Sequence, residues 1–152
     1  MNRRWTLPLL LALIGNSSNL FAENGSFEKT IPVPRTADAR LGWAYQGCSV
    51  ESLTLRNYPD DEDIQEARSK DPGDKTWLWW EFNVANKSDR KCKISLSVEV
   101  LDKKGSVVKS SDRSDSVSAG EPDDEIRVST LMKTLDIADA PKVRLRAIIV
   151  PR

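Results

Sequence analysis

Alternating apolar and polar positions predict that most of this chain is built from β-strands. In the clearest segment, residues 92–100, every second side chain is apolar: Cys92, Ile94, Leu96, Val98 and Val100. Such alternation places one face of a strand against a core and the other face in water. The same pattern predicts further strands in four places: residues 49–56, 77–86, 126–131 and 143–150.

Polar segments mark the connections between these strands. Residues 102–105 (DKKG) have the composition of a hairpin turn, with glycine where a positive φ is expected. We expect a short return strand over residues 106–110 and then a loop rich in Ser and Asp over residues 111–124. Residues 134–140 form either one turn of helix or a simple crossover.

The longest connection, residues 57–75, is an acidic insertion. Its middle contains helix-forming residues between two prolines, which predicts a short surface helix over residues 60–70, capped by Asp60 or Asp61. The acidic run Asp60, Asp61, Glu62 and Asp63 lacks the oxygen spacing and the glycine of a calcium loop. We therefore interpret it as a solvated acidic loop, with a weak, non-specific cation site as the alternative. Such a loop could also enter a basic cleft on a partner protein.

The first 22 residues have the three parts of a secretory signal. Arg3 and Arg4 form a basic start, residues 7–15 are apolar, and a polar-to-small region ends at Ala22. We expect cleavage after Ala22 and a periplasmic or secreted protein, with an uncleaved N-terminal anchor as the alternative. The apolar stretch is too short to span about 30 Å of hydrocarbon as a helix.

The rest of the chain is predicted to be one domain. Residues 23–40 are polar and contain Pro32 and Pro34, which favours an extended N-terminal arm or an edge strand. Residues 41–152 contain the remaining strand patterns, with no internal repeat and no second core. They predict an antiparallel β-sandwich of about seven strands, immunoglobulin-like and all-β, with the acidic loop as an insertion.

Composition and charge exclude several classes of function. The chain has 152 residues, of which 23 are Lys or Arg and 23 are Asp or Glu, so it lacks the basic excess of a nucleic-acid-binding protein. It contains no His, which excludes His-based triads, His general bases and His metal sites. We expect a protein that is not an enzyme and binds neither a metal nor a cofactor.

The two cysteines, Cys48 and Cys92, predict a disulfide in an exported domain. If residues 49–56 and 77–86 pair antiparallel, Cys48 lies at the same end of the sandwich as Cys92. Two cysteines at one end can reach the Cα separation that a disulfide needs. Buried free thiols and metal ligands are the alternatives.

Residues 80–120 resemble the FxLyD-type, immunoglobulin-like domains of exported bacterial proteins. The resemblance rests on a strand that ends in Asn, a strand end at the F-x-L-y-D position, a turn with its return strand, and a Gly-Glu before the next strand. These segments are residues 81–86 (EFNVAN), 98–102 (VEVLD), 103–108 (KKGSVV) and 119–121 (AGE). The resemblance implies a non-enzymatic β-sandwich that serves as an accessory or binding module, with no catalytic residues.

Aromatic residues are the candidates for binding. Alternation places Trp77 and Trp79 on the outer face of their strand, together with Glu81 and Asn83, while Trp80 belongs to the core. Trp43 and Tyr45 show the same alternation and complete the candidate set. An open face of this kind binds proteins, peptides or sugars, because Trp offers a large contact area at low entropy cost. The alternative is that the insertion or the N-terminal arm covers the two outer tryptophans.

These patterns favour a binding or accessory role. The leading expectation is a module that contacts a protein partner in the periplasm or outside the cell, for example as an inhibitor or accessory subunit of an exported protein. The alternative is a glycan- or cell-wall-binding module that uses the tryptophan pair. Neither nucleic acid nor a stable membrane span after signal removal is expected.

Overall fold

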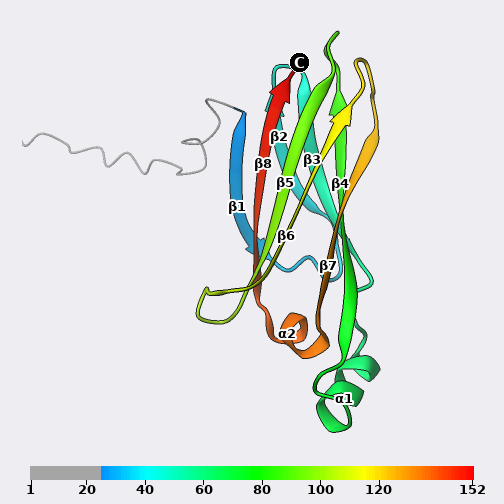
Figure 1. Ribbon diagram of the computed structural model, residues 1–152, viewed down its shortest axis with the longest axis vertical. Coiled ribbons are helices and arrows are strands. Elements are labelled where there is room, and N and C mark those ends of the chain that lie inside the picture. Colours follow the sequence, from blue (N-terminus) through cyan, green and yellow to red (C-terminus); the bar gives the residue numbers. More distant parts are fainter. Residues whose placement is uncertain (1–24) are drawn as a thin grey trace, which may run out of the picture.

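Two four-stranded antiparallel sheets pack face to face around one core (Figure 1). The structure is a computed structural model that describes residues 25–152, so the predicted signal lies outside the described residues. Its strands are β1 (Ser26–Pro32), β2 (Ala39–Tyr45), β3 (Cys48–Arg56), β4 (Lys75–Asn86), β5 (Cys92–Leu101), β6 (Val107–Val117), β7 (Asp124–Lys133) and β8 (Lys142–Pro151). Its helices are α1 (Asp61–Ser69) and α2 (Thr134–Asp139).

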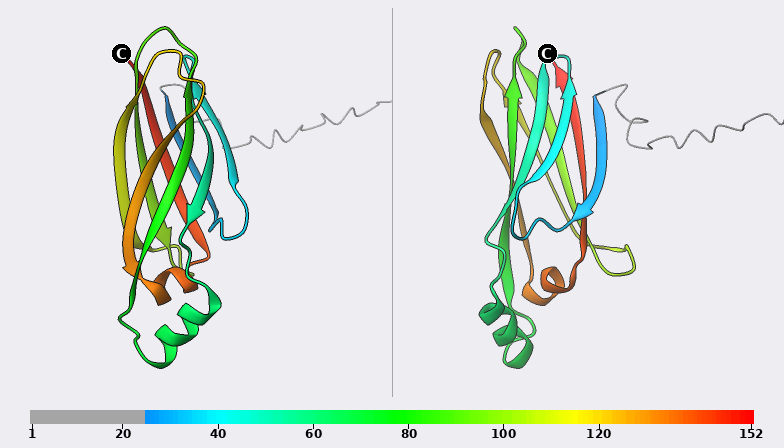
Figure 2. Two further views of the ribbon diagram at one scale, coloured as in Figure 1. Left: turned by 90° about the vertical axis from the view of Figure 1, so that its right-hand side faces the viewer. Right: turned by 180° about the vertical axis from the view of Figure 1, so that it is seen from behind.

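The strand order confirms the predicted all-β sandwich. One sheet has the order β1-β8-β5-β6 and the other has the order β2-β3-β4-β7. The described chain has eight strands rather than about seven, because Ser26–Pro32 pairs with β8 as an edge strand of the first sheet. Both helices lie at the end of the sandwich opposite the C-terminus, as the views in Figures 1 and 2 agree.

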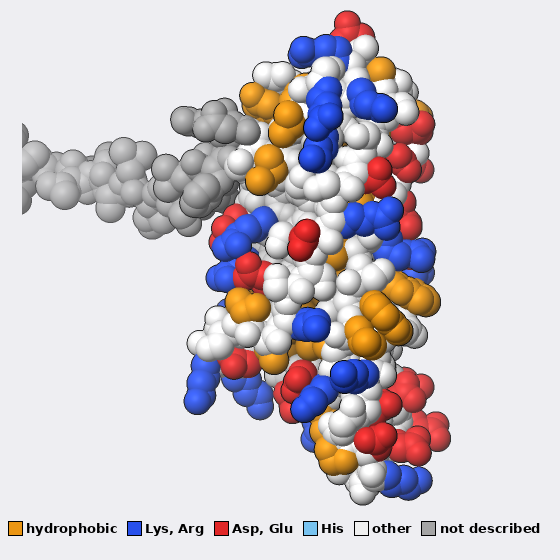
Figure 3. All heavy atoms as spheres, in the orientation of Figure 1, with side chains coloured by type: hydrophobic (Ala, Val, Ile, Leu, Met, Phe, Trp, Pro, Cys, Tyr) orange, Lys and Arg blue, Asp and Glu red, His pale blue; other side chains and the backbone are white. Residues whose placement is uncertain are grey.

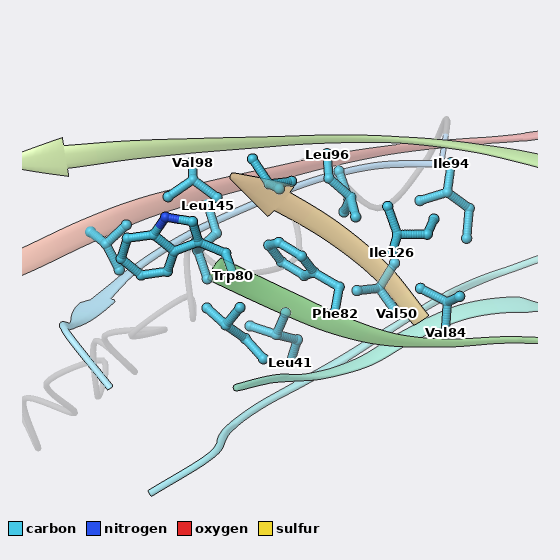
Figure 4. Close-up of a cluster of buried hydrophobic side chains, with 14 of the residues drawn as sticks. Leu41, Val50, Trp80, Phe82, Val84, Ile94, Leu96, Val98, Ile126 and Leu145 are labelled. Carbon is cyan, nitrogen blue, oxygen red and sulfur yellow. The ribbon is translucent and has the colours of Figure 1, made fainter. Parts of the chain in front are cut away.

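The core lies between β4 and β5, the strands with the clearest alternation. Trp80, Phe82 and Val84 of β4 are fully buried and face Ile94 and Leu96 of β5 (Figure 4). The intervening side chains of both strands point to the outer faces of the two sheets. Alternation in these segments therefore predicted correctly which side chains form the core.

The Cys48–Cys92 disulfide joins the two sheets and confirms the predicted pairing. Cys48 starts β3, opposite Asn86 of β4, and Cys92 starts β5. Their Cα atoms are 6.6 Å apart, and both side chains are completely buried. The bridge lies at the C-terminal end of the sandwich, where Cys92 is opposite Pro151 of β8.

At the corner between β1 and β2, a pair of aromatic side chains joins the edges of the two sheets. The rings of Phe27 and Trp43 stack with their centroids 5.7 Å apart. Trp43 is only 7% exposed, because every second side chain of β2 points into the core and Trp43 is one of these. The structure therefore places Trp43 in the core, not on the surface that the sequence predicted.

A chain of hydroxyl groups links the sheets at the opposite corner. The buried Trp80 Nε1–H donates to Thr130 Oγ1 at 3.1 Å, and the Thr130 hydroxyl donates to Ser111 Oγ at 2.8 Å. These residues belong to β4, β7 and β6, so the contact connects the edge strands of both sheets. Thr130 both satisfies the indole N–H and holds β6 against β7.

The predicted Ser/Asp-rich loop over residues 111–124 is wrong for its first half, because β6 continues to Val117. The whole strand pairs with β5, from Val107 opposite Leu101 to Val117 opposite Cys92. Nearly all of its side chains are exposed. An edge strand held by backbone pairing shows little hydrophobic alternation, so its sequence resembles that of a loop.

The predicted surface helix in the insertion is confirmed as α1, and Asp60 is its N-cap. Asp60 Oδ1 accepts from the Asp63 N–H at 2.8 Å, while Asp63 reaches back to the Asp60 N–H. Residues 134–139 form the short helix α2, which packs beside α1 through an Arg68–Asp139 ion pair. Within residues 25–152, neither helix is long and apolar enough to cross a membrane.

Candidate functional site

The outer face of β4 exposes two large aromatic side chains. Trp77 is 51% exposed and Trp79 is 37% exposed, so the insertion and the N-terminal segment of the described chain leave both accessible. In the sheet register, Trp77 lies opposite Leu131 of β7, and Trp79 lies opposite Arg56 of β3. We call Trp77, Trp79, Leu131, Arg56 and the neighbouring Arg127 the tryptophan face.

A buried carboxylate fixes the two arginines of this face. Glu81 is 6% exposed and accepts a hydrogen bond from Arg56 Nε at 2.6 Å and another from Arg127 Nη2 at 2.9 Å. The hydrogen bond to Glu81, and then the charge of that carboxylate, raise the pKa of Arg56 above its ordinary value. Glu81 is on the predicted face, but it lies beneath the arginines and positions them.

Arg127 also contacts the ring of Trp79. Its Cζ lies 5.3 Å from the ring centroid, within the range of a cation–π contact. The same guanidinium is thereby shared between a buried carboxylate and an exposed indole. As a result, one side of the Trp79 ring is covered and its orientation is fixed.

The other sequence-predicted residues have different surroundings. Asn83 Nδ2 donates to Asp123 Oδ1 at 2.9 Å, which ties the upper part of the β4 face to the turn before β7. Tyr45 is half-buried on β2, with its hydroxyl accepting from Gln46 Nε2 at 3.1 Å. Trp43 and Tyr45 lie on the far edge strand of the sheet, so they are not part of the tryptophan face.

The site predicted from the sequence did not include Arg56, Arg127 or Leu131. Arg127 and Leu131 occupy outward positions in a strand that was predicted, and Arg56 ends another. The pairing of β3 with β4 was considered for the disulfide, but the position of β7 on the other side of β4 was not predictable from one sequence. Knowledge of the strand order, combined with the alternation, would have placed all three beside the tryptophans.

The acidic run in the insertion has a structural role in addition to its charge. Asp60 and Asp63 form the reciprocal cap of α1, while Asp61 and Glu62 point into solvent in its first turn. Among residues 25–152, no group of three or more potential ligands is arranged to hold a metal ion. The run therefore begins a helix, and its negative charges interact favourably with the positive end of the helix dipole.

The outer face of the other sheet contains a network of ion pairs. Glu99 of β5 is paired with Arg144 and Arg146 of β8, and Arg146 Nε also donates to Glu28 of β1 at 2.9 Å. The hydrogen bond to Glu28 raises the pKa of Arg146. This network links three strands, and the exposed apolar side chains of Ile148 and Val150 lie farther along β8.

Comparisons with known proteins do not assign this chain to a family. No family model matches the chain, and no curated protein sequence matches it. Among solved structures, the enzymatically active domain of tailspike protein 4 from bacteriophage CBA120 is similar with 7% sequence identity and a TM-score of 0.22. That similarity covers 86% of this chain and 20% of the tailspike chain, and at such a TM-score it bears on neither fold nor function.

Proposed function

We propose that this protein is a non-enzymatic binding module that docks a partner protein through the tryptophan face. The observation that supports this most is the pair of accessible indoles, Trp77 and Trp79, on the outer face of a sheet with Arg127 fixed against one of them. Tryptophan and arginine are the residues most enriched among those that dominate binding energy at protein interfaces. The Trp79 indole, which is held by Arg127, also loses little conformational entropy on binding.

A protein partner fits this face better than a carbohydrate does. Sugar binding on a tryptophan platform needs free ring faces for stacking, and Arg127 occupies one side of Trp79. The uncovered Trp77 is the remaining platform, and it lies beside the aliphatic Leu131. An apolar cluster bordered by guanidinium groups is the arrangement expected for contact with another protein.

The proposed location is the periplasm or the extracellular space. The buried Cys48–Cys92 disulfide supports it, because such bonds form and persist in oxidising compartments. The signal-like residues 1–22 support it independently, from the sequence alone.

Site-specific photo-crosslinking tests the proposed function. A photoreactive phenylalanine analogue replaces Trp77 in one variant and Ile148, which is similarly exposed on the opposite sheet, in a control. We expect a discrete cross-linked protein from the position 77 variant and none from the control. Loss of that product when Trp79→Ala is added would confirm the site. A product of equal yield at both positions, or glycan-array binding that Trp77→Ala abolishes, would contradict the proposal.

A further inference from the structure

Four basic side chains surround the two exposed tryptophans. Arg56 and Arg127 flank Trp79 on its two sides, from β3 and β7. Lys75 and Lys133 lie opposite each other in the β4–β7 register, two residues from Trp77 and from Leu131 along their strands, and both are exposed. Alternate residues of a strand share a face and are about 7 Å apart, so Lys75 lies next to Trp77 on the same face of β4, and Lys133 lies diagonally across from Trp77 on β7.

Only part of this positive charge is neutralised within the protein. Glu81 is shared by both arginines, and Glu125 is 3.7 Å from Arg127. Among residues 25–152, no ion pair or side-chain hydrogen bond engages Lys75 or Lys133. The side chains of Arg56 and Arg127 remain 61% and 46% exposed, so they also present charge to solvent.

The space-filling view agrees with this arrangement. Toward the right-hand side of Figure 3, a group of hydrophobic side chains has Lys and Arg side chains above and below it. Acidic side chains gather farther down, at the α1 end. Two acidic groups there are already paired, Glu66 with Lys70 and Asp139 with Arg68. The tryptophan face therefore has an apolar centre with basic side chains around it, and the acidic side chains of α1 lie beyond this border.

We infer that the partner of the tryptophan face is an extended, acidic segment of a protein that lies along β4. This inference rests on the proposed function. An apolar side chain of the segment packs between Trp77 and Trp79, and carboxylates on either side of it meet the lysine pair and the arginine pair. Lys75, Trp77, Trp79 and Glu81 alternate along β4, so a segment of about seven extended residues covers the stretch from the lysine pair to the arginine pair.

Selection from a random peptide library displayed on phage tests this inference. The intact protein is the target, and binders that also bind the Trp77→Ala/Trp79→Ala variant are removed. We expect the remaining peptides to contain an aromatic or branched apolar residue with an excess of Asp and Glu around it. Neutral or basic tryptophan-dependent peptides would overturn the inference and leave the proposed function standing.

Charge reversal on the two lysines provides the quantitative control. Lys75→Glu/Lys133→Glu should raise the Kd of a selected peptide about tenfold at physiological salt, mostly because the association rate falls. The matched variant Lys103→Glu/Lys104→Glu changes the same charge on the β5–β6 hairpin and should leave the Kd unchanged. Equal weakening by both pairs would mean that only net charge matters, and would overturn the inference.

Two further outcomes separate this inference from the proposed function. If no tryptophan-dependent peptide is selected but cross-linking at position 77 succeeds, the partner presents a folded surface and the extended-segment inference is wrong. If both experiments fail, the proposed function itself is wrong. Alginate serves as a polyanion probe. If alginate binds in a way that depends on Trp77 and Lys75, and no peptide binds, the inference is overturned in favour of an anionic glycan.

Discussion

Arg127 lies over the ring of Trp79, with its Cζ 5.3 Å from the ring centroid, and its Nη2 donates to the buried Glu81 at 2.9 Å. The exposed indole and the interior of the face are therefore connected through one guanidinium. Any substitution at position 127 affects both the orientation of the binding surface and the environment of a buried carboxylate.

Arg127→Ala should lower the free energy of unfolding by about 1–2 kcal/mol, because Glu81 loses one of two charged hydrogen bonds and keeps only Arg56. Urea denaturation monitored by circular dichroism measures this. Lys133→Ala, on the same strand and face, should change stability by less than about 0.5 kcal/mol. Equal losses in the two variants would contradict a structural role for the Arg127–Glu81 pair.

Thr130→Val should destabilise the fold by about 1–3 kcal/mol, because it leaves the buried Trp80 N–H without an acceptor. Thr130→Ser keeps the hydroxyl and removes one methyl group, and should cost about 1 kcal/mol or less. Thermal and urea unfolding of both variants distinguish the hydrogen bond from simple packing. If Thr130→Val, which keeps the methyl group, costs no more than Thr130→Ser, the hydroxyl is not what stabilises this corner.

Removing the disulfide should cost about 4 kcal/mol, from the entropy of a closed loop of this length. The Cys48–Cys92 sequence separation of 44 residues sets that length. Denaturation of the oxidised protein, of the same protein in reducing agent, and of Cys48→Ala/Cys92→Ala tests the prediction. The reduced protein and the variant should agree to within the packing cost of the lost sulfur atoms, and a loss below 1 kcal/mol would contradict it.

Ionisation of Tyr58 should lower the free energy of unfolding at alkaline pH. Burial raises the pKa of its phenol above the ordinary value, and the nearby Asp139 and Asp61 add to this, while Arg35 lowers the pKa. Because the folded pKa is the higher one, the stabilisation is fully present below a pH of about 10 and is lost as the pH rises through the folded pKa. Tyr58→Phe should remove this loss, as measured by unfolding at pH 9 and pH 11. An unchanged pH dependence in that variant would assign the effect to other groups.

Where burial alternates along a strand, the sequence predicted the fold well. The segment beginning at Cys92 proved to be β5, with the predicted side chains in the core, and the cysteine pairing followed from the expected strand topology. The helix in the insertion was predicted from local chemistry, since Asp60 caps it independently of the rest of the fold. These features depend on nearest neighbours in sequence or on one hydrophobic face.

The sequence was less informative where tertiary position decides. Residues 111–117 resemble a loop because an edge strand needs backbone pairing but few apolar side chains. Trp43 and Trp79 both occur in alternating segments, yet Trp43 stacks against Phe27 inside the sandwich and Trp79 faces solvent. Alternation shows that two faces exist, and only the arrangement of the sheets shows which one is buried.

The position of the disulfide makes the two ends of the sandwich mechanically unequal. The C-terminal end is closed by a covalent bond between the sheets, while the opposite end is closed by two short helices and their side-chain contacts. We therefore expect the sheets to separate first at the helical end, which should show the faster amide hydrogen exchange. Trp77 lies toward that end, near the start of β4, while the covalently closed end holds the strand register.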